Sequence, residues 1–227
     1  MRDAPRILVP PPGPRAQEII ARDARVLSQN YRKDYPLVVD TARGAVVQDV
    51  DGNRYLDFAA GIAVVATGHC HPEVVAAVKA QADRFLHMCA TDFYYENVVA
   101  LAEGLTRRAP GPGPWRAFFA NSGAEVVEAA VKLARLRTGR QKIVAFYGAF
   151  HGRTYGALSL TASKPVQRRG YAPLLPEVLH THYAYCYRCP VNRRPSTCDI
   201  ECLDLLTETM FSTTTDPREV AAVIVEP

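Results

Sequence analysis

Residues 121–125, Asn-Ser-Gly-Ala-Glu, have the composition of a helix start that could bind an anion. Ser122 can cap a helix, and Glu125, three positions later, completes a capping box. Gly123 lets the backbone approach a ligand closely. A helix that begins here directs free N–H groups and a positive dipole end at one point, which suits a phosphate. An ordinary capped helix fits the same pattern, so the motif alone leaves both interpretations open.

A second segment with chemical potential lies at residues 148–154, where an aromatic ring, an imidazole and a guanidinium occur together. Phe150 could stack on a flat heteroaromatic cofactor, and Arg153 could pair bidentately with a carboxylate. Alternatively, Phe150 belongs to the core and Arg153 is solvated. The segment by itself does not decide between these interpretations.

The cysteine spacing raises the question of a metal site. Cys186, Cys189, Cys198 and Cys202 have the CxxC and CxxxC spacing of a tetrahedral zinc site. The alternative is a loop of reduced thiols at a domain or subunit contact, because Cys198 and Cys202 also stand at the start of a predicted helix and could pack there. The sequence His-Cys-His at residues 69–71 has no further ligand nearby and opens a helix, which disfavours metal there.

The elements around the first two segments predict how they are positioned. Residues 115–120 are short, aromatic and apolar, as in a buried strand. Residues 123–138 have helical spacing, Gly139 ends that helix, and residues 142–147 predict the next strand. This order indicates a βαβ unit with a parallel sheet and a right-handed crossover. Ligands bind beyond the carboxyl ends of such strands, so the Ser122 turn and the 148–154 segment should meet at one edge.

The rest of the chain predicts a mixed α/β protein. An extended proline-rich arm at residues 10–14 is followed by a small antiparallel sheet, with turns at Arg43-Gly44 and at residues 51–53. Residues 59–68 are small and apolar, which fits either close approach to a ligand or partner chain or a buried linker. Further helices are expected at 15–27, 72–85, 97–107 and 199–211, and strands at 38–49, 54–58 and 220–225.

Composition limits the classes of function. The 227 residues are 48% hydrophobic with a net charge of +4, which describes a globular protein. The basic residues are dispersed, so we expect no nucleic-acid partner, and no apolar run is long enough to span a bilayer. Residues 1–14 lack the apolar core of a signal peptide, and six cysteines without such a signal favour reduced thiols in the cytoplasm.

Taken together, these motifs resemble those of the class III pyridoxal-phosphate aminotransferases. The resemblance runs from about residue 14 to residue 227 and is strongest to 4-aminobutyrate aminotransferases and their acetylornithine, ornithine and racemase relatives. It rests on several motifs in the same order, at residues 49–57, 61–63, 67–72, 121–125, 150–154 and 225–227. Their combination is far more specific than any one of them.

The resemblance implies a fold and a set of site residues. The fold would be an incomplete fold type I large domain, a three-layer and mostly parallel α/β structure. Residues 1–60 would form the arm and part of a small domain, and residues 61–227 the first half of the cofactor-binding domain. The implied cofactor-binding residues are Ser122, Gly123 and Ala124 at the phosphate, Phe150 on the pyridine ring, His151, and Glu226 behind the ring. The implied substrate-binding residues are Ile62 and Arg153.

The resemblance also implies a reaction that uses pyridoxal 5'-phosphate as the cofactor. An amino group would be transferred, by a ping-pong mechanism, from a 4-aminobutyrate-like or ornithine-like ω-amine to a 2-oxo acid. The enzyme would be a homodimer. A racemase of the same family and a metal-binding module remain alternatives. The family's Schiff-base lysine and pyridine-nitrogen aspartate would lie after Pro227, since Lys132, Lys142 and Lys164 do not match that position. We therefore expect the chain to be the N-terminal half of an enzyme, inactive alone and without nucleic-acid or membrane partners.

Overall fold

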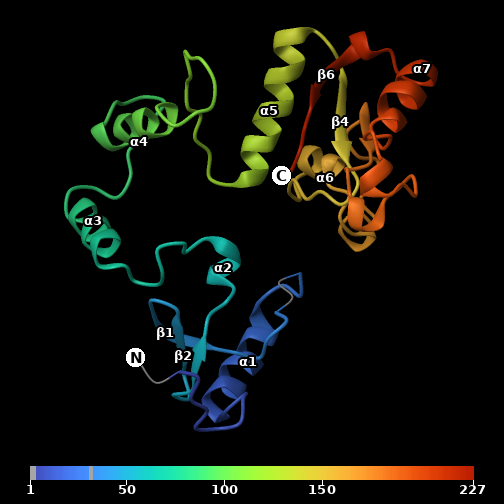
Figure 1. Cartoon of the computed structure of the whole chain (residues 1–227). Helices are drawn as coiled ribbons and strands as arrows, with labels where there is room; N and C mark the ends of the chain where they lie inside the picture. Colours follow the sequence, from blue (N-terminus) through green and yellow to red (C-terminus); the bar gives the residue numbers. More distant parts are fainter. Residues whose placement is uncertain (1–3, 31–32) are drawn as a thin grey trace. The chain divides into compact units, whose positions relative to one another are not determined.

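The computed structural model describes residues 4–30 and 33–227, which divide into two units, Met1–Tyr95 and Glu96–Pro227 (Figure 1). The assignment of residues 1–60 to a small domain and of residues 61–227 to a cofactor-binding domain stays a prediction. No described helix is both long and apolar enough to cross a membrane.

The first unit contains a three-stranded antiparallel sheet, in the order β1-β2-β3. Its elements are α1 (Pro14–Val26), β1 (Val39–Arg43), β2 (Val46–Asp49), β3 (Arg54–Leu56), α2 (Ala60–Ala63) and α3 (Pro72–Ala82). The predicted hairpin turns lie where expected. The helix predicted at 15–27 corresponds to α1, which begins and ends one residue earlier. Proline starts both α1 and α3, because it lacks an N–H that the first helical turn would leave unbonded.

Buried polar groups organise this first unit. The Asp49 carboxylate, 2% exposed, accepts hydrogen bonds from the Asp51 N–H (3.0 Å), from both nitrogens of Asn53 (2.8 Å each) and from the Tyr55 hydroxyl (3.0 Å). The Asn53 amide oxygen accepts from the N–H groups of Leu8 (2.7 Å) and Val9 (2.9 Å). The hairpin turn thereby fixes the proline-rich arm.

The second unit contains a three-stranded parallel sheet, in the order β5-β4-β6. Its main elements are α4 (Glu96–Thr106), α5 (Gly123–Thr138), β4 (Lys142–Phe146), α6 (Tyr155–Leu160), β5 (Val178–Thr181), the π-helix η4 (Leu205–Met210), α7 (Phe211–Thr213) and β6 (Val220–Val223). Single 3-10 turns lie at η1 (Pro165–Gln167), η2 (Cys186–Arg188), η3 (Pro195–Thr197) and η5 (Pro217–Glu219).

The core of the second unit lies around β4, with α5 packed along β6 and α6 (Figure 1). Ile143, Val144 and Ala145 are fully buried, because β4 is the central strand and is covered on both faces. Ile143 and Ala145 form a cluster with Val131 of α5 and with Leu160.

The structure corrects three predictions in this unit. Residues 115–120 are not a strand: Trp115, Phe118 and Phe119 are 47%, 69% and 41% exposed, and no described strand pairs with them. The βαβ unit predicted from that strand is therefore wrong in its first member, although β4 does have parallel partners, β5 and β6. The helix predicted at 199–211 begins only at η4. The sequence analysis also missed α6 and β5.

Candidate active site

The start of α5 is a helix end with open N–H groups. The Ser122 hydroxyl accepts a hydrogen bond from the Glu125 N–H (3.3 Å), so the predicted cap is confirmed. The Glu125 carboxylate accepts from the N–H of Asn121 (2.6 Å), one residue before the cap. No described residue accepts a bond from the N–H of Gly123 or Ala124, and a Cβ on Gly123 would lie in open space. These two amides can therefore bind an anion.

Three hydrogen bonds position residues 150–152, in the middle of the 148–154 segment. The Glu226 carboxylate, just beyond β6, accepts from the Phe150 N–H (2.7 Å). The buried Thr161 hydroxyl accepts from the His151 N–H (2.9 Å) and donates to the Gly152 carbonyl (3.0 Å). The segment is thus attached to the elements on either side of it, and Glu226 is bonded to the backbone of Phe150.

Gly152 lies close against the first turn of α5. Its φ is +134°, and a Cβ there would lie 2.8 Å from the Ala124 Cβ and 2.9 Å from the Ala157 Cβ. Only glycine combines that backbone conformation with so close a contact. The predicted meeting of the Ser122 turn and the 148–154 segment is therefore confirmed, even though residues 115–120 form no strand.

The side chains of this segment offer a ring face and a neutral imidazole. Phe150 is 39% exposed, so it is not a core residue, and the Arg153 guanidinium lies 5.9 Å from its ring centroid. Burial lowers the pKa of His151, and the nearby Glu226 offsets that only in part, so the imidazole is neutral at pH 7. Its Nε2 atom is buried without a hydrogen-bond partner among the described residues. It is available to a ligand.

Glu226 also borders a hollow beyond the carboxyl end of β4. The Tyr183 hydroxyl donates to the Glu226 carbonyl (2.7 Å) and accepts from the Glu226 N–H (3.1 Å), while its ring stacks on Phe146 with centroids 4.7 Å apart. The hollow, about 620 Å³, is lined in part by Tyr147, Gly148, Tyr185 and Arg188. Its volume is typical of pockets that hold a small molecule.

Glu128 is a residue that the sequence analysis missed. One of its carboxylate oxygens accepts from the Thr154 hydroxyl (2.5 Å) and from the N–H groups of Gly156 (2.9 Å) and Ala157 (3.1 Å). It therefore caps α6 from a distant helix. The available signal was Thr154 followed by small residues, a combination typical of a helix start that the sequence analysis did not assign as one.

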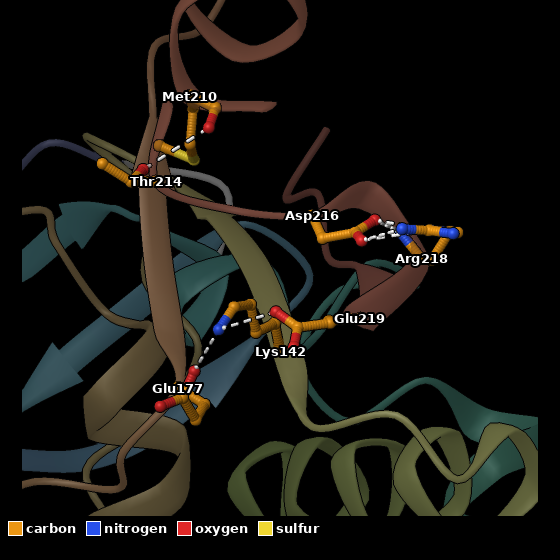
Figure 2. Close-up of polar contacts among 7 residues, drawn as sticks. All are labelled: Lys142, Glu177, Met210, Thr214, Asp216, Arg218 and Glu219. Atoms are coloured by element: carbon orange, nitrogen blue, oxygen red, sulfur yellow. Dashed lines mark hydrogen bonds and ion pairs between the residues drawn. The ribbon is translucent and has the colours of Figure 1, made fainter. Parts of the chain in front are cut away.

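Lys142 lies at the opposite edge of the sheet from Phe150. It begins β4, and its ammonium contacts Glu177 (2.8 Å) and Glu219 (3.1 Å), as Figure 2 shows. The hydrogen bonds that its ammonium donates to these two carboxylates raise its pKa. It is therefore held as a charged group, away from the segment that carries Phe150.

Ile62 belongs to the first unit. It is 92% exposed and has a φ of +62°, in a left-handed turn where Ala60, Gly61 and Ala63 also have positive φ. The roles of Ile62 and Arg153 in substrate binding stay predictions.

The zinc arrangement is not formed. All six cysteines are free, and no three His, Cys, Asp or Glu side chains among the described residues lie where they could hold a metal ion. Cys198 and Cys202 do not begin a helix, because η4 starts at Leu205. The sequence spacing of the four cysteines therefore carries no metal site in this structure.

Comparison with known proteins identifies the family of the chain. The family model "Aminotransferase class-III" matches residues 27–227. A 4-aminobutyrate aminotransferase of Mycobacterium tuberculosis is 42% identical over 83% of this chain and 42% of its own length. An alanine/serine racemase of Pyrococcus horikoshii is 38% identical over 100% of this chain and 49% of its own length.

Among solved structures, the taurine:2-oxoglutarate aminotransferase of Bifidobacterium kashiwanohense, in complex with pyridoxal phosphate and glutamate, is 28% identical with a TM-score of 0.78. The match covers 92% of this chain and 47% of that one. This chain spans less than half the length of each of these relatives. The fold is that of the pyridoxal-phosphate-dependent transaminases, in incomplete form, and the chain belongs to the class III aminotransferase family.

Proposed function

We propose that this chain provides the phosphate-binding and ring-binding part of a pyridoxal-phosphate-dependent aminotransferase. The observation that carries the proposal is the contact of Gly152 with Ala124. It brings an open helix start and an aromatic segment to one place, and a phosphorylated planar ring needs both.

Each residue has a role that its geometry supports. The N–H groups of Gly123 and Ala124 donate to the phosphate, next to the Ser122 cap. Phe150 offers a ring face, held in place by Glu226 through its backbone N–H. His151 offers a neutral imidazole. When bound, pyridoxal phosphate supplies an electron sink for amino-group chemistry.

Arg153 and Ile62 are the proposed substrate contacts. The Arg153 guanidinium can pair bidentately with a substrate carboxylate once it leaves the Phe150 face, because both contacts use the same planar group. Ile62 would border the substrate pocket with an apolar side chain.

We infer that the chain alone does not turn over amino acids. Lys142 is engaged by two carboxylates at the far edge of the sheet. Lys132 lies nine residues into α5, about 13.5 Å along the axis from its start at 1.5 Å per residue. The test is incubation of the purified chain with pyridoxal phosphate, an amino acid and a 2-oxo acid. Turnover above the rate of free cofactor would overturn the inference.

The proposed substrate is an ω-amino acid such as 4-aminobutyrate or ornithine, with a 2-oxo acid as acceptor. The name of the M. tuberculosis relative supports it. A racemase is the second candidate, because the P. horikoshii relative matches the whole chain. The test is a chimera that joins this sequence to the remaining part of a full-length relative. The chirality of its product would distinguish a racemase from an aminotransferase. A homodimer in the cytoplasm, without nucleic-acid or membrane partners, completes the proposal.

Cofactor titration of the purified chain tests the site. Pyridoxal phosphate should quench the fluorescence of Trp115, which lies in the same unit, and saturate with one site. Phe150→Ala should weaken binding about tenfold, because an aromatic contact contributes on the order of 1 kcal/mol. Ser122→Ala should weaken it by a similar factor through loss of the helix cap. Glu103→Gln on α4 is the control. Unchanged affinity in both site variants would contradict the proposed site.

A further inference from the structure

Glu128 lies where it can connect the two halves of the candidate site. It belongs to α5, the helix whose start carries the open N–H groups, and its carboxylate binds the first turn of α6. We propose that Glu128 is a positioning residue, which fixes the Phe150 segment against the start of α5 by capping α6. This inference rests on the proposed cofactor site.

The contact of Glu128 with α6 is strong and specific. A single carboxylate oxygen accepts three hydrogen bonds, two from backbone N–H groups and one from the Thr154 hydroxyl. Bonds to an ionised acceptor are about twice as strong as neutral ones. A Cβ on Gly156 would collide with the carboxylate, so glycine at that position is what lets Glu128 reach the helix. The pair therefore fixes where α6 begins.

Helix α6 carries this constraint to the ring-binding segment. Glu128 binds its first turn, and Thr161, which follows its last turn, bonds the His151 N–H and the Gly152 carbonyl. Residues 155–160, between these two points, form about one and a half helical turns. Gly156 through Leu160 are buried. A shift of the first turn therefore moves Thr161, and with it the backbone next to Phe150.

The phosphate-binding end does not depend on this contact. Ser122 is held by Glu125 within α5 itself, and neither residue contacts Glu128 in any described hydrogen bond. Loss of Glu128 should therefore weaken recognition of the ring and leave recognition of the phosphate unchanged. A residue that merely stabilises the whole unit would weaken both together.

The experiment compares Glu128→Ala and Glu128→Gln in the 227-residue chain, with Glu103→Ala and Glu103→Gln as matched controls. Glu103 is an exposed helical glutamate with only a long pair to Arg107 (3.9 Å). The first measurement is hydrogen exchange at the Gly156 and Ala157 amides. The second is the dissociation constant of pyridoxal phosphate, by titration, and of inorganic phosphate, by competition. The third is the visible circular dichroism of the bound ring.

We expect Glu128→Ala to speed exchange of the two amides about tenfold, because each loses a bond to a charged acceptor. It should weaken pyridoxal phosphate about tenfold, change inorganic phosphate less than about twofold, and reduce the dichroism of the ring. Glu128→Gln should restore most of each value, since its amide oxygen can accept the same bonds. The control variants should match the parent chain.

Two results would overturn the proposal: unchanged exchange at Gly156 and Ala157 in Glu128→Ala, or an equal loss of affinity for phosphate and for pyridoxal phosphate. If Glu128→Ala does not fold, Thr154→Val, which removes one of the three bonds to the same carboxylate oxygen, carries the same comparison, and equal losses for both ligands again count against it. If the parent chain binds no pyridoxal phosphate, the proposed function fails, while the exchange data still judge the role of Glu128.

Discussion

The starts of helices α1 and α5 differ in what occupies their N–H groups. In α1, the Asp51 carboxylate of a distant turn accepts from the N–H groups of Arg15 (3.0 Å) and Ala16 (2.9 Å). Gly13 makes room for it, since a Cβ there would lie 2.5 Å from the Asp51 Cγ. In α5, the Glu125 N–H donates to the Ser122 hydroxyl of the helix's own cap, whereas the N–H groups of Gly123 and Ala124 have no acceptor among the described residues. A closed start holds the chain together, whereas an open one is available to a ligand.

Helix α6 repeats the closed arrangement of α1. A carboxylate from elsewhere in the unit, Glu128, caps it, and a glycine at the contact makes room. Closing a helix start with a remote carboxylate is therefore a device that both units use. The start of α5, which the family motif at residues 121–125 predicts to hold the cofactor phosphate, has no such remote carboxylate among the described residues.

The largest expected effect comes from filling the open start. Pyridoxal phosphate at 100 times its dissociation constant should raise the free energy of unfolding of the second unit by about 2.7 kcal/mol. The first unit should not change, because its helix start is already closed. Native-state hydrogen exchange at Val144 in β4 and Val47 in β2 measures the two units separately. An equal increase in protection of Val144 and Val47 would contradict the proposed difference between the open start of α5 and the closed start of α1.

A substitution that blocks the closed start of α6 should change the free energy of unfolding somewhat less. Gly156→Ala places a Cβ in the Glu128 carboxylate and should lower the free energy of unfolding of the second unit by about 2 kcal/mol. Gly104→Ala on α4 is the matched change, and it should stabilise by about 0.5 kcal/mol because its Cβ meets nothing closer than 3.8 Å. Chemical denaturation measures both. If the two substitutions acted alike, the steric account of Gly156 would be wrong.

Removing the cap of α1 should have a smaller effect. Asp51→Ala should destabilise the first unit by about 1 kcal/mol, as is usual for loss of an N-terminal cap. Asp40→Ala, at an exposed position of β1 beside the register shift, should change it by less than about 0.5 kcal/mol. Exchange at the Ala16 amide should rise only in the first variant. Protection that survives Asp51→Ala would show that another group closes this helix.

The two units should also differ in how acid affects them, which is the smallest effect. Burial lowers the pKa of His180 in β5 below its ordinary 6.5. The unfolded chain then binds that proton more readily, so stability of the second unit is full above pH 6.5 and falls below it. For Asp49, burial raises the pKa, but hydrogen bonds from Asn53, Tyr55 and Asp51 together lower it below 3.8. Its contribution is present above pH 3.8 and is lost below that value.

The second unit should therefore begin to lose stability at a higher pH than the first. Backbone amide NMR spectra between pH 7 and pH 3 would show signals of β4 and β5 weakening before those of β2. His180→Gln should remove part of the early phase, because glutamine does not titrate, and the rest belongs to His151, whose pKa burial also lowers. Simultaneous loss of both sets of signals would contradict the assignment of the early phase to the two histidines and of the late phase to Asp49.

The sequence predicted the helix starts and turns better than it predicted the strands. Ser122, Gly139 and Pro72 act through local hydrogen bonds or fixed dihedrals, so their effect can be read along the chain. A strand also needs a partner: residues 115–120 have strand composition but pair with no described strand. Helix α6 was missed because almost every residue in it is buried, which removes the polar face that marks a surface helix.

The sequence predicted those residues of the candidate site that belong to a recognisable motif. Phe150, Ser122 and Glu226 are named by their motifs, and the structure brings Phe150 to Glu226 and Gly152 to Ala124. The role of Glu128 was not, because its partners lie 26 to 29 residues away and depend on how α6 packs. Long-range contacts of this kind come from packing and leave no periodic signal.

The orientation of the Ile62 side chain depends on the left-handed turn at residues 60–63. A left-handed conformation costs a non-glycine residue roughly 1–2 kcal/mol. Here the Asp57 carboxylate holds the N–H groups of Ala59 (2.8 Å) and Ala60 (2.9 Å) and bonds the His69 ring (2.6 Å). Carbethoxylation of His69 would break the bond between its ring and Asp57 and weaken the support of that carboxylate, so a reagent that never touches Ile62 would change how firmly its side chain is held.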